Sequence, residues 1–463
     1  AQQTNPAQLK VTITHTVDNF FTTIVGIPRT TITRSGVAEF QGPVPMGSPA
    51  NTYGNETIGA GDTRWSNTYT SSSNQPGFWA NVAGPQSTKT NGDAFQAAIC
   101  QGADGCNGST NTDYSPNGYF YSVTVPQAGT VDIQVFDPAF VNVDDHCGTN
   151  LDNATSARNP FVTDAATRYA KGDGAFCTGD QLFTGGSGDG VPPTTTFVFR
   201  SPTNTPWDPT SAPVINNGTC QPRQYAGYNV NLASALNAPA VGPNPNAELQ
   251  KDFRQWVDVC KVSAPAAGTY WVQVRTNVAM GNPTGVGNPN MAGGGHNRYA
   301  IRAAMVNGSG NPSTTAGVKI EAAQAMGIYA NAPAGTTQFF LARVPSGTGG
   351  HTLVLNFFDI SDASQAGSLS IVPPPDAHTS FTNCVASGPQ TGTLSTCTVS
   401  ANSSFNGRWE TVRVPIPAGY TCADTDPKGC WVRINYAYGN GATVQDTTTW
   451  TASLEGDPVR LIQ

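Results

Sequence analysis

"GYFYSVTVPQAGTVDIQVFDP" occupies residues 118–138, and a similar phrase, "QFFLARVPSGTGGHTLVLNFFD", occupies residues 338–359. Each phrase begins with aromatic residues in an alternating run, turns at Val-Pro, passes a glycine and ends in Phe-Asp. Alternating apolar and polar residues indicate half-buried strands, and Pro and Gly between two such runs indicate a hairpin. The sequence therefore predicts the same β-hairpin twice.

Each phrase has a second half that repeats the pattern of strand, Pro-Gly turn and strand. In the first case this is "QWVDVCKVSAPAAGTYWVQVRTN" (255–277), and in the second it begins "RWETVRVPIPAGY" (408–420). We predict an all-β fold with two related antiparallel β-sandwich domains of jelly-roll or fibronectin-like character. The first domain is expected at 36–305 and the second at 314–463, joined by a Gly-, Ser- and Asn-rich linker.

The two predicted copies differ in one long segment. Asp137 and Trp256 are 119 residues apart, whereas Asp359 and Trp409 are 50 residues apart. The first copy therefore carries an insertion of about 70 residues near 144–250, and long loops of this kind are usually functional or disordered. Its glycine-rich stretch 172–190, which contains Asp180, is expected to form a surface loop, with a calcium loop as the alternative.

Composition limits the class of protein. Charged residues make up 11% of the 463 residues, the net charge is −7, and Gly (50) and Pro (35) are abundant. Turn-rich neutral surfaces fit an extracellular all-β protein, and the absence of a basic cluster argues against nucleic-acid binding. No apolar run approaches the ~20 residues that span a bilayer.

The ten cysteines are even in number and lack the spacing of zinc ligands. We predict five disulfides formed in an oxidising compartment. Three pairs are close in sequence: Cys100–Cys106, Cys384–Cys397 and Cys422–Cys430. The other four cysteines allow three connectivities, of which we favour Cys147–Cys177 with Cys220–Cys260.

Residues 1–35 are predicted to form a separate module of a strand, a short helix and a strand. "LKVTITHTV" (9–17) alternates, "DNFFTTIVGI" (18–27) follows, and "RTTITRSGVAEF" (29–40) is a second strand expected to pair with the first. We expect Asp18 to cap the turn. Phe20, Phe21, Ile24 and Val25 are expected to point inward.

Over residues 1–40 this order of segments resembles TadE/TadG-like proteins of tight-adherence (Flp) pilus systems. In that family the segment follows a single N-terminal membrane helix. The resemblance implies a pilus-associated protein with other pilus or envelope proteins as partners. Membrane contact is expected only if such a helix has been removed from this chain.

The aspartates that end the two phrases suggest calcium sites. Asp137 is followed by Asp144 and Asp145, and Asp359 by Asp362. Calcium takes six to eight oxygen ligands, which carboxylates and loop carbonyls can supply. The alternative is that each Asp stabilises a turn by accepting a backbone hydrogen bond. Ca²⁺ at Asp137, Asp144, Asp145, Asp359 and Asp362 is therefore a prediction with a structural alternative.

No motif recommends an enzyme. HExxH, GxSxG and P-loop patterns are missing, and glutamates are few and scattered. Aromatic residues such as Trp79, Trp271 and Tyr436 would form either a sugar-binding face or the core. We expect a secreted or cell-surface structural or adhesive protein without catalytic activity that self-associates or joins a filament. The alternative is a calcium-dependent polysaccharide-binding module.

Overall fold

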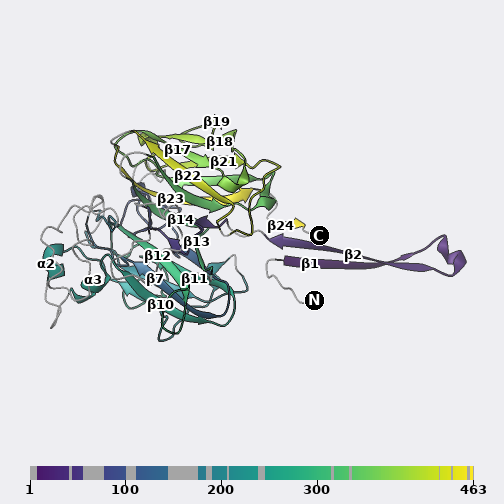
Figure 1. Cartoon of the computed structure of the whole chain (residues 1–463), viewed down its shortest axis with the longest axis horizontal. Helices are drawn as coiled ribbons and strands as arrows, with labels where there is room; N and C mark the ends of the chain where they lie inside the picture. Colours follow the sequence, from purple (N-terminus) through teal and green to yellow (C-terminus); the bar gives the residue numbers. More distant parts are fainter. Residues whose placement is uncertain are drawn as a thin grey trace.

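The fold is all-β, as predicted. The computed structural model describes residues 8–40, 44–55, 78–100, 111–143, 176–183, 190–205, 208–237, 246–313, 317–332, 336–426, 428–439, 442–455 and 459–461. Two large antiparallel sheets pack against each other, and a small third sheet projects from them (Figure 1). None of the helices in these segments is long and apolar enough to cross a membrane.

The first large sheet takes strands from both predicted domains, which are called here the first half (36–305) and the second half (314–463). In spatial order its strands are β10 (Trp256–Ala264), β7 (Gly129–Phe136), β12 (His296–Val306), β5 (Phe78–Ala83), β14 (Ala325–Ala332), β23 (Val444–Glu455), β16 (Thr352–Phe358), β21 (Trp409–Pro415), β18 (Cys384–Ser387) and β19 (Gly392–Leu394), with β4 (Thr52–Tyr53) paired to β12. The halves meet where β5 pairs with β14, with Ala80 opposite Ile328.

The second large sheet is continuous in the same way. Its strands are β20 (Thr398–Ala401), β17 (Gly367–Val372), β22 (Trp431–Tyr438), β15 (Thr336–Arg343), β3 (Met46–Gly47), β13 (Lys319–Ala323), β6 (Tyr119–Val125), β11 (Gly268–Arg275), β8 (Thr195–Arg200) and β9 (Arg223–Tyr225). The short β3 joins the halves by pairing with both β13 and β15. Both sheets therefore pass from one predicted domain to the other without a break.

In the part of the chain that the structure describes, the helical segments are short. They are α2 (Leu232–Asn237), α3 (Ala247–Asp252) and the 3-10 helices η1 (Thr22–Val25), η2 (Lys89–Asn91), η5 (Pro209–Ser211), η6 (Ser346–Thr348), η7 (Pro375–Ala377) and η8 (Ser403–Phe405). Leu249 and Phe253 pack α3 into a small apolar cluster beside the first half. The core itself lies between the two sheets.

The two repeated phrases occupy the same pair of strands in each half. The first phrase forms β6 and β7, which pair with β11 and β10, and β7 also pairs with β12. The second forms β15 and β16, which pair with β22 and β21, and β16 also pairs with β23. Phe136 lies opposite Trp256 and Phe358 lies opposite Trp409, so the two phrases end in equivalent positions.

Alternation along these strands builds the core. Val131, Ile133 and Val135 of β7 face Tyr121 and Val123 of β6 in one continuous apolar cluster, and all five are buried. Burying an aliphatic side chain of this size contributes about 1.5–3 kcal/mol. The repeated apolar pattern therefore fixes which face of each strand points inward.

The N-terminal module forms a hairpin that projects from the body (Figure 1). β1 (Gln8–Asp18) pairs with β2 (Arg29–Phe40) as predicted, and β24 (Val459–Leu461) pairs with the base of β2. The inward orientation expected for Phe20, Phe21, Ile24 and Val25 is wrong.

Those four side chains are 86, 79, 87 and 73% exposed. The amphipathic pattern identifies a shared face, but within the described chain the body lies too far away to cover it. Asp18 does not cap the turn; it forms an ion pair with Arg29 at 2.6 Å.

Three predicted disulfides are confirmed in the described chain: Cys220–Cys260, Cys384–Cys397 and Cys422–Cys430. Cys100 and Cys177 are also disulfide-bonded. Their predicted partners, Cys106 and Cys147, lie outside the described residues. Disulfides persist in oxidising compartments, so the fold is suited to a location outside the cytoplasm.

Candidate functional site: two Phe-Asp corners and the groove beside them

The first corner is the turn at Asp137, directly after β7. Asp137 is buried and has a φ of 52°, in the left-handed region that Asp tolerates better than most residues. Its carboxylate accepts hydrogen bonds from the Arg254 backbone N–H (3.1 Å) and the Thr178 hydroxyl (2.8 Å). Both donors are far from Asp137 in the sequence, so the carboxylate joins this corner to two distant segments of the chain.

The second corner repeats this backbone geometry at Asp359, directly after β16. Asp359 is buried with a φ of 58°, and its carboxylate accepts a hydrogen bond from the Gly407 backbone N–H at 2.5 Å. Within the described chain its other oxygen, Oδ2, is buried without a hydrogen-bond partner. An unpaired buried oxygen is costly, so the second corner has capacity for a proton or a cation.

Acidic groups gather at the second corner. Asp446 accepts hydrogen bonds from the backbone N–H groups of Ser361 (2.9 Å) and Asp362 (3.0 Å), and from the Tyr436 hydroxyl (2.9 Å). Burial, Asp362 and Asp446 together raise the pKa of Asp359 well above its usual value. Burial also raises the pKa of Asp446 to about 6.

At the first corner a buried arginine accompanies the acid. Asp180 accepts hydrogen bonds from the backbone N–H groups of Val141 (2.8 Å) and Arg298 (2.7 Å). Burial and the neighbouring Asp137 raise the pKa of Asp180, and the Arg298 guanidinium opposes that shift. Asp180 is 0% exposed, so the surface loop predicted for its segment is wrong at this residue.

Two cations of the first half reach into the second half. The Arg298 guanidinium lies 3.5 Å from the centre of the Tyr329 ring and donates to the Thr447 hydroxyl at 2.8 Å. The Lys89 ammonium is buried, pairs with Asp113 at 2.8 Å and lies 4.8 Å from the centre of the Phe358 ring. These contacts hold the two corners in a fixed relation. Sequence reasoning missed both contacts, because they depend on how the halves meet.

A groove of about 540 Å³ lies beside the second corner, between the two halves. Its lining is mostly amide and hydroxyl side chains with one aromatic ring: Thr90, Asn91, Gln181, Phe183, Arg298, Asp362, Ala363, Ser364, Asn406, Thr443, Gln445 and Thr447. Pockets of about 300–1,000 Å³ hold small ligands. Amide and hydroxyl side chains can donate hydrogen bonds to, and accept them from, a hydroxyl-rich ligand. Of the predicted site residues that the structure describes, Asp362 lines this groove.

The other predicted sites are distributed as follows. Asp144 and Asp145 lie outside the described residues. In the described chain, the group of three potential ligands with close ligand atoms is Asp376, Cys422 and Cys430, and the two cysteines are bonded to each other. Calcium at the corners stays a prediction.

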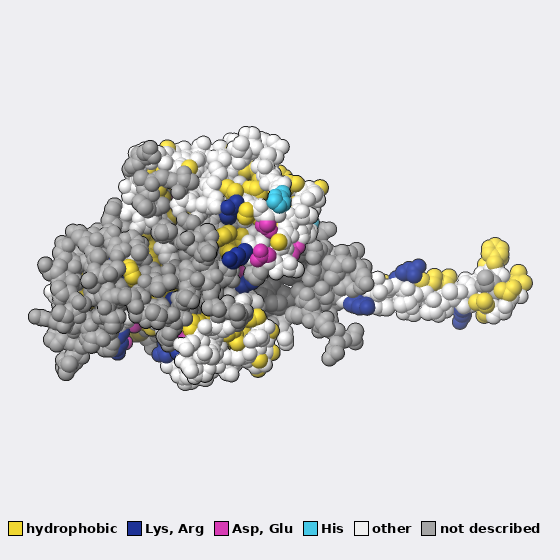
Figure 2. Space-filling model, in the orientation of Figure 1, with side chains coloured by type: hydrophobic (Ala, Val, Ile, Leu, Met, Phe, Trp, Pro, Cys, Tyr) yellow, Lys and Arg dark blue, Asp and Glu magenta, His cyan; other side chains and the backbone are white. Residues whose placement is uncertain are grey.

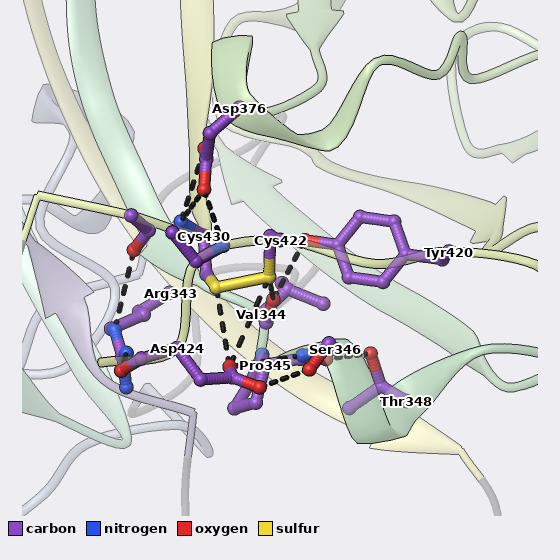
Figure 3. Close-up of a disulfide and its surroundings, with 12 residues drawn as sticks. Arg343, Val344, Pro345, Ser346, Thr348, Asp376, Tyr420, Cys422, Asp424 and Cys430 are labelled. Carbon is purple, nitrogen blue, oxygen red and sulfur yellow. Dashed lines mark hydrogen bonds between the residues drawn. A yellow bond between two sulfur atoms is a disulfide. The ribbon is translucent and has the colours of Figure 1, made fainter. Parts of the chain in front are cut away.

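That disulfide has a structural setting, visible in Figure 3. Asp376 accepts hydrogen bonds from the backbone N–H groups of Ala423 (2.8 Å) and Cys430 (3.1 Å). The Tyr420 hydroxyl donates to the Val344 carbonyl at 2.7 Å. The Val344 backbone N–H donates to the Cys430 carbonyl at 2.8 Å, so the bridge lies against the Val-Pro turn of the second phrase.

The aromatic residues considered for a sugar-binding face belong to the interior instead. Trp79 and Tyr436 are 0% exposed and Trp271 is 5% exposed. Phe183, which the sequence did not single out, is the aromatic residue at the groove, where its ring lies edge-on to His296 at 5.0 Å.

Comparison with known proteins adds no family. No protein-family model matches the chain, and no curated protein or solved structure is significantly similar to it.

Proposed function

We propose that this chain is an extracellular structural and adhesive component, part of a pilus or another surface filament. One observation carries the proposal: both large sheets run through both halves, and a long arm projects from this single body (Figure 1). A body fused through its sheets resists bending between its halves, and a projecting arm can reach another subunit. The disulfides suit such a protein outside the cytoplasm.

The resemblance of residues 1–40 to TadE/TadG-like proteins supports the same proposal. The strand, short helix and strand of that segment are present as β1, η1 and β2. The partners we propose are further copies of the chain or other envelope proteins.

The proposal is tested on intact cells of the source organism. An antibody raised against the folded body should label the cell surface or its filaments in immunogold microscopy, and deletion of the gene should remove the label. Cells lysed before labelling serve as the control for access. Label confined to lysed cells, or protein found only as a free monomer in the medium, would contradict the proposal.

A second candidate function is polysaccharide binding at the groove, with calcium at the adjacent corner. The specific observation is the lining, in which Asn91, Asn406 and Gln445 offer amide groups beside the Phe183 ring. Amides can donate to and accept from neighbouring sugar hydroxyls, while a ring packs on the sugar face.

The test is a glycan array followed by calorimetry with any glycan that binds. Asn91→Ala with Asn406→Ala should weaken binding at least tenfold. Asn290→Ala, which changes an exposed amide that is not part of the lining, should leave it unchanged. Binding that survives the double substitution would exclude the groove.

A further inference from the structure

The projecting hairpin, residues 8–40, is here called the arm, and one of its two faces is apolar. Residues paired across an antiparallel ladder lie on the same face. The register pairs Val11 with Gly36, Ile13 with Arg34, His15 with Ile32, and Val17 with Thr30. Val11, Ile13, Val17 and Ile32 are 49, 65, 38 and 42% exposed. The opposite face is a ladder of hydroxyls, including the pairs Thr14–Thr33 and Thr16–Thr31, each at 3.2 Å.

The tip of the arm continues the apolar face. Its side chains include Phe20, Phe21, Ile24, Val25 and Ile27, the last 52% exposed. The sequence between Asp18 and Arg29 contains no charged residue. Figure 2 shows these apolar side chains gathered at the far end of the arm. An apolar surface of this size on a projecting element marks an interaction site.

The neck of the tip is the place where Asn19 lies opposite residues 27–30, and its polar groups form hydrogen bonds within the arm. The Asn19 backbone N–H donates to the Pro28 carbonyl at 2.8 Å. The Asn19 side-chain amide donates to the Ile27 carbonyl (3.2 Å) and the Thr30 hydroxyl (2.6 Å). Burying polar groups is costly only when they lose their partners. The neck can therefore leave water while it keeps these bonds.

The shape of the arm indicates what covers it. A two-stranded hairpin alone is marginally stable in water, and β24 pairs with β2 at residues 38–40, so cover along the face as well as at the tip would stabilise the rest of the arm. The arm is bulky at the tip, with Phe20, Phe21 and Ile24, and slender near the base, where Val11 lies opposite Gly36. We propose that two copies of the chain pack their arms antiparallel, apolar face on apolar face, with each tip over the Val11–Gly36 base of the other copy.

The area available is enough for a stable dimer only if the tips take part. The stem has two strands, and at ~3.3 Å per residue and ~4.8 Å of width per strand its 11-residue length presents about 350 Å² per copy. Two stem faces bury about 700 Å², below the ~1,200 Å² of a stable interface. The five large tip side chains of each copy add about as much again, since an aromatic side chain alone buries ~150 Å² or more. The tip is therefore the decisive part of the contact.

Charge on the face does not oppose this packing. Arg34 is the charged residue of the apolar face within the described arm, and its exposed side chain donates to the Thr33 carbonyl at 3.4 Å. A long arginine side chain can pack its methylene groups and keep its guanidinium in water. A two-fold pair of this kind is closed, so it produces a dimer.

This inference rests on the proposed structural role and deepens it by naming the first partner, a second copy. The proposed dimer and the proposed structural role can fail separately. Dimerisation is measured on purified full-length chain, whereas the structural role is measured on cells.

The experiment compares two substitutions in the full chain by sedimentation velocity over a range of concentrations. Ile24→Glu places a charge in the tip, and Thr14→Glu places the same charge on the hydroxyl face. Both residues are exposed, so both variants should fold, which circular dichroism checks. The wild type should dimerise, Ile24→Glu should raise the dissociation constant at least 100-fold, and Thr14→Glu should change it less than threefold.

A cross-link checks the direction of packing. Copies carrying Val11→Cys mixed with copies carrying Ile24→Cys should form a mixed disulfide dimer, and Thr14→Cys copies should not join them. A wild type that stays monomeric, or a dimer that survives Ile24→Glu, overturns the proposal. Equal loss in both Glu variants overturns the assigned face. A monomer whose tip instead binds vesicles of mixed neutral and anionic phospholipid, with binding lost in Ile24→Glu, assigns the tip to lipid and overturns the second copy.

Discussion

The two Phe-Asp corners share a backbone and differ in charge. Ala300 lies opposite Phe136, and Thr449 lies opposite Phe358. Three residues before each of these, the first half has Asn297 and the second half has Asp446. Asn297 donates its side-chain amide to the Pro138 carbonyl at 3.0 Å, whereas Asp446 accepts from the Ser361 and Asp362 backbones.

This difference in charge gives the two corners different roles: the first corner fixes a segment of the chain, and the second is a candidate binding site. At the first corner a neutral amide and the Arg298 guanidinium offset the two aspartates, and Thr178 and Asp180 fix the inserted segment to the sandwich. At the second corner the acidic groups gather beside an open groove. The two turns thus share a backbone conformation and differ in the charged groups around them.

The strongest test of the comparison makes the first corner resemble the second. Asn297→Asp replaces a buried donor with an acceptor that faces the Pro138 carbonyl, and it removes the hydrogen bond to the Thr195 hydroxyl (2.6 Å). An uncompensated buried charge costs about 3–5 kcal/mol, so we expect the free energy of unfolding to fall by about 4 kcal/mol at pH 7. Urea denaturation measures it.

Asn297→Ser, which keeps a hydroxyl donor, is the control and should lose less than half as much. An Asn297→Asp variant as stable as the wild type would mean that the first corner tolerates a third acidic side chain. The difference in charge would then not distinguish the two corners.

The reverse change, Asp446→Asn, tests the second corner through pH. The pKa of Asp446 is raised to about 6 in the folded protein against an ordinary value of 3.8. Between these values the folded state binds a proton that the unfolded state does not, so this group's stabilisation is present at low pH and is lost as pH rises toward 6. At about 1.36 kcal/mol per pKa unit, wild type should lose up to about 3 kcal/mol over this window relative to Asp446→Asn.

His296 provides the internal reference for that measurement. Burial and Arg298 hold its pKa well below 6.5, so its contribution has the opposite sign: stability falls as pH drops below 6.5. The difference between wild type and Asp446→Asn cancels the histidine term. A flat difference between pH 4 and 7 would show that Asp446 is not the titrating group.

Adding calcium tests whether the second corner binds a metal ion or only a proton. If the buried Oδ2 of Asp359 and the Asp362 carboxylate serve an ion, calcium should raise the thermal midpoint and chelator should lower it. Binding to the folded state alone stabilises by about 2.7 kcal/mol at a hundredfold excess over Kd. Asp362→Asn should abolish the effect and Asp137→Asn should not. A midpoint unmoved by calcium would leave both aspartates as turn residues.

Much of the fold, but little of the site, was predictable from sequence. Alternation and Pro-Gly turns gave the strands and the repeated hairpins, because both signals are local. Cys220–Cys260 followed from pairing neighbours. Arg298–Thr447 and Lys89–Phe358 join residues far apart in the chain and depend on how the halves fuse, which no local pattern encodes. The prediction that the apolar side chains of the arm point inward was wrong for a related reason. A pattern shows which residues share a face, but it does not show what lies against that face.

The smallest expected effect compares the two corner aspartates directly, in calcium-free buffer. The Asp137 carboxylate accepts hydrogen bonds from the Arg254 backbone N–H and the Thr178 hydroxyl, whereas the Asp359 carboxylate accepts one from the Gly407 backbone N–H. The raised pKa of Asp359 favours its neutral form, which a neutral amide resembles. Asp359→Asn should therefore change the free energy of unfolding by less than about 1 kcal/mol, and Asp137→Asn should cost about 1–2 kcal/mol through weakened charge-assisted bonds. Urea denaturation of both variants at pH 7 decides the order. If Asp359→Asn is the costlier change, the second corner depends on the charge of Asp359. The second corner would then not be the more adaptable of the two corners.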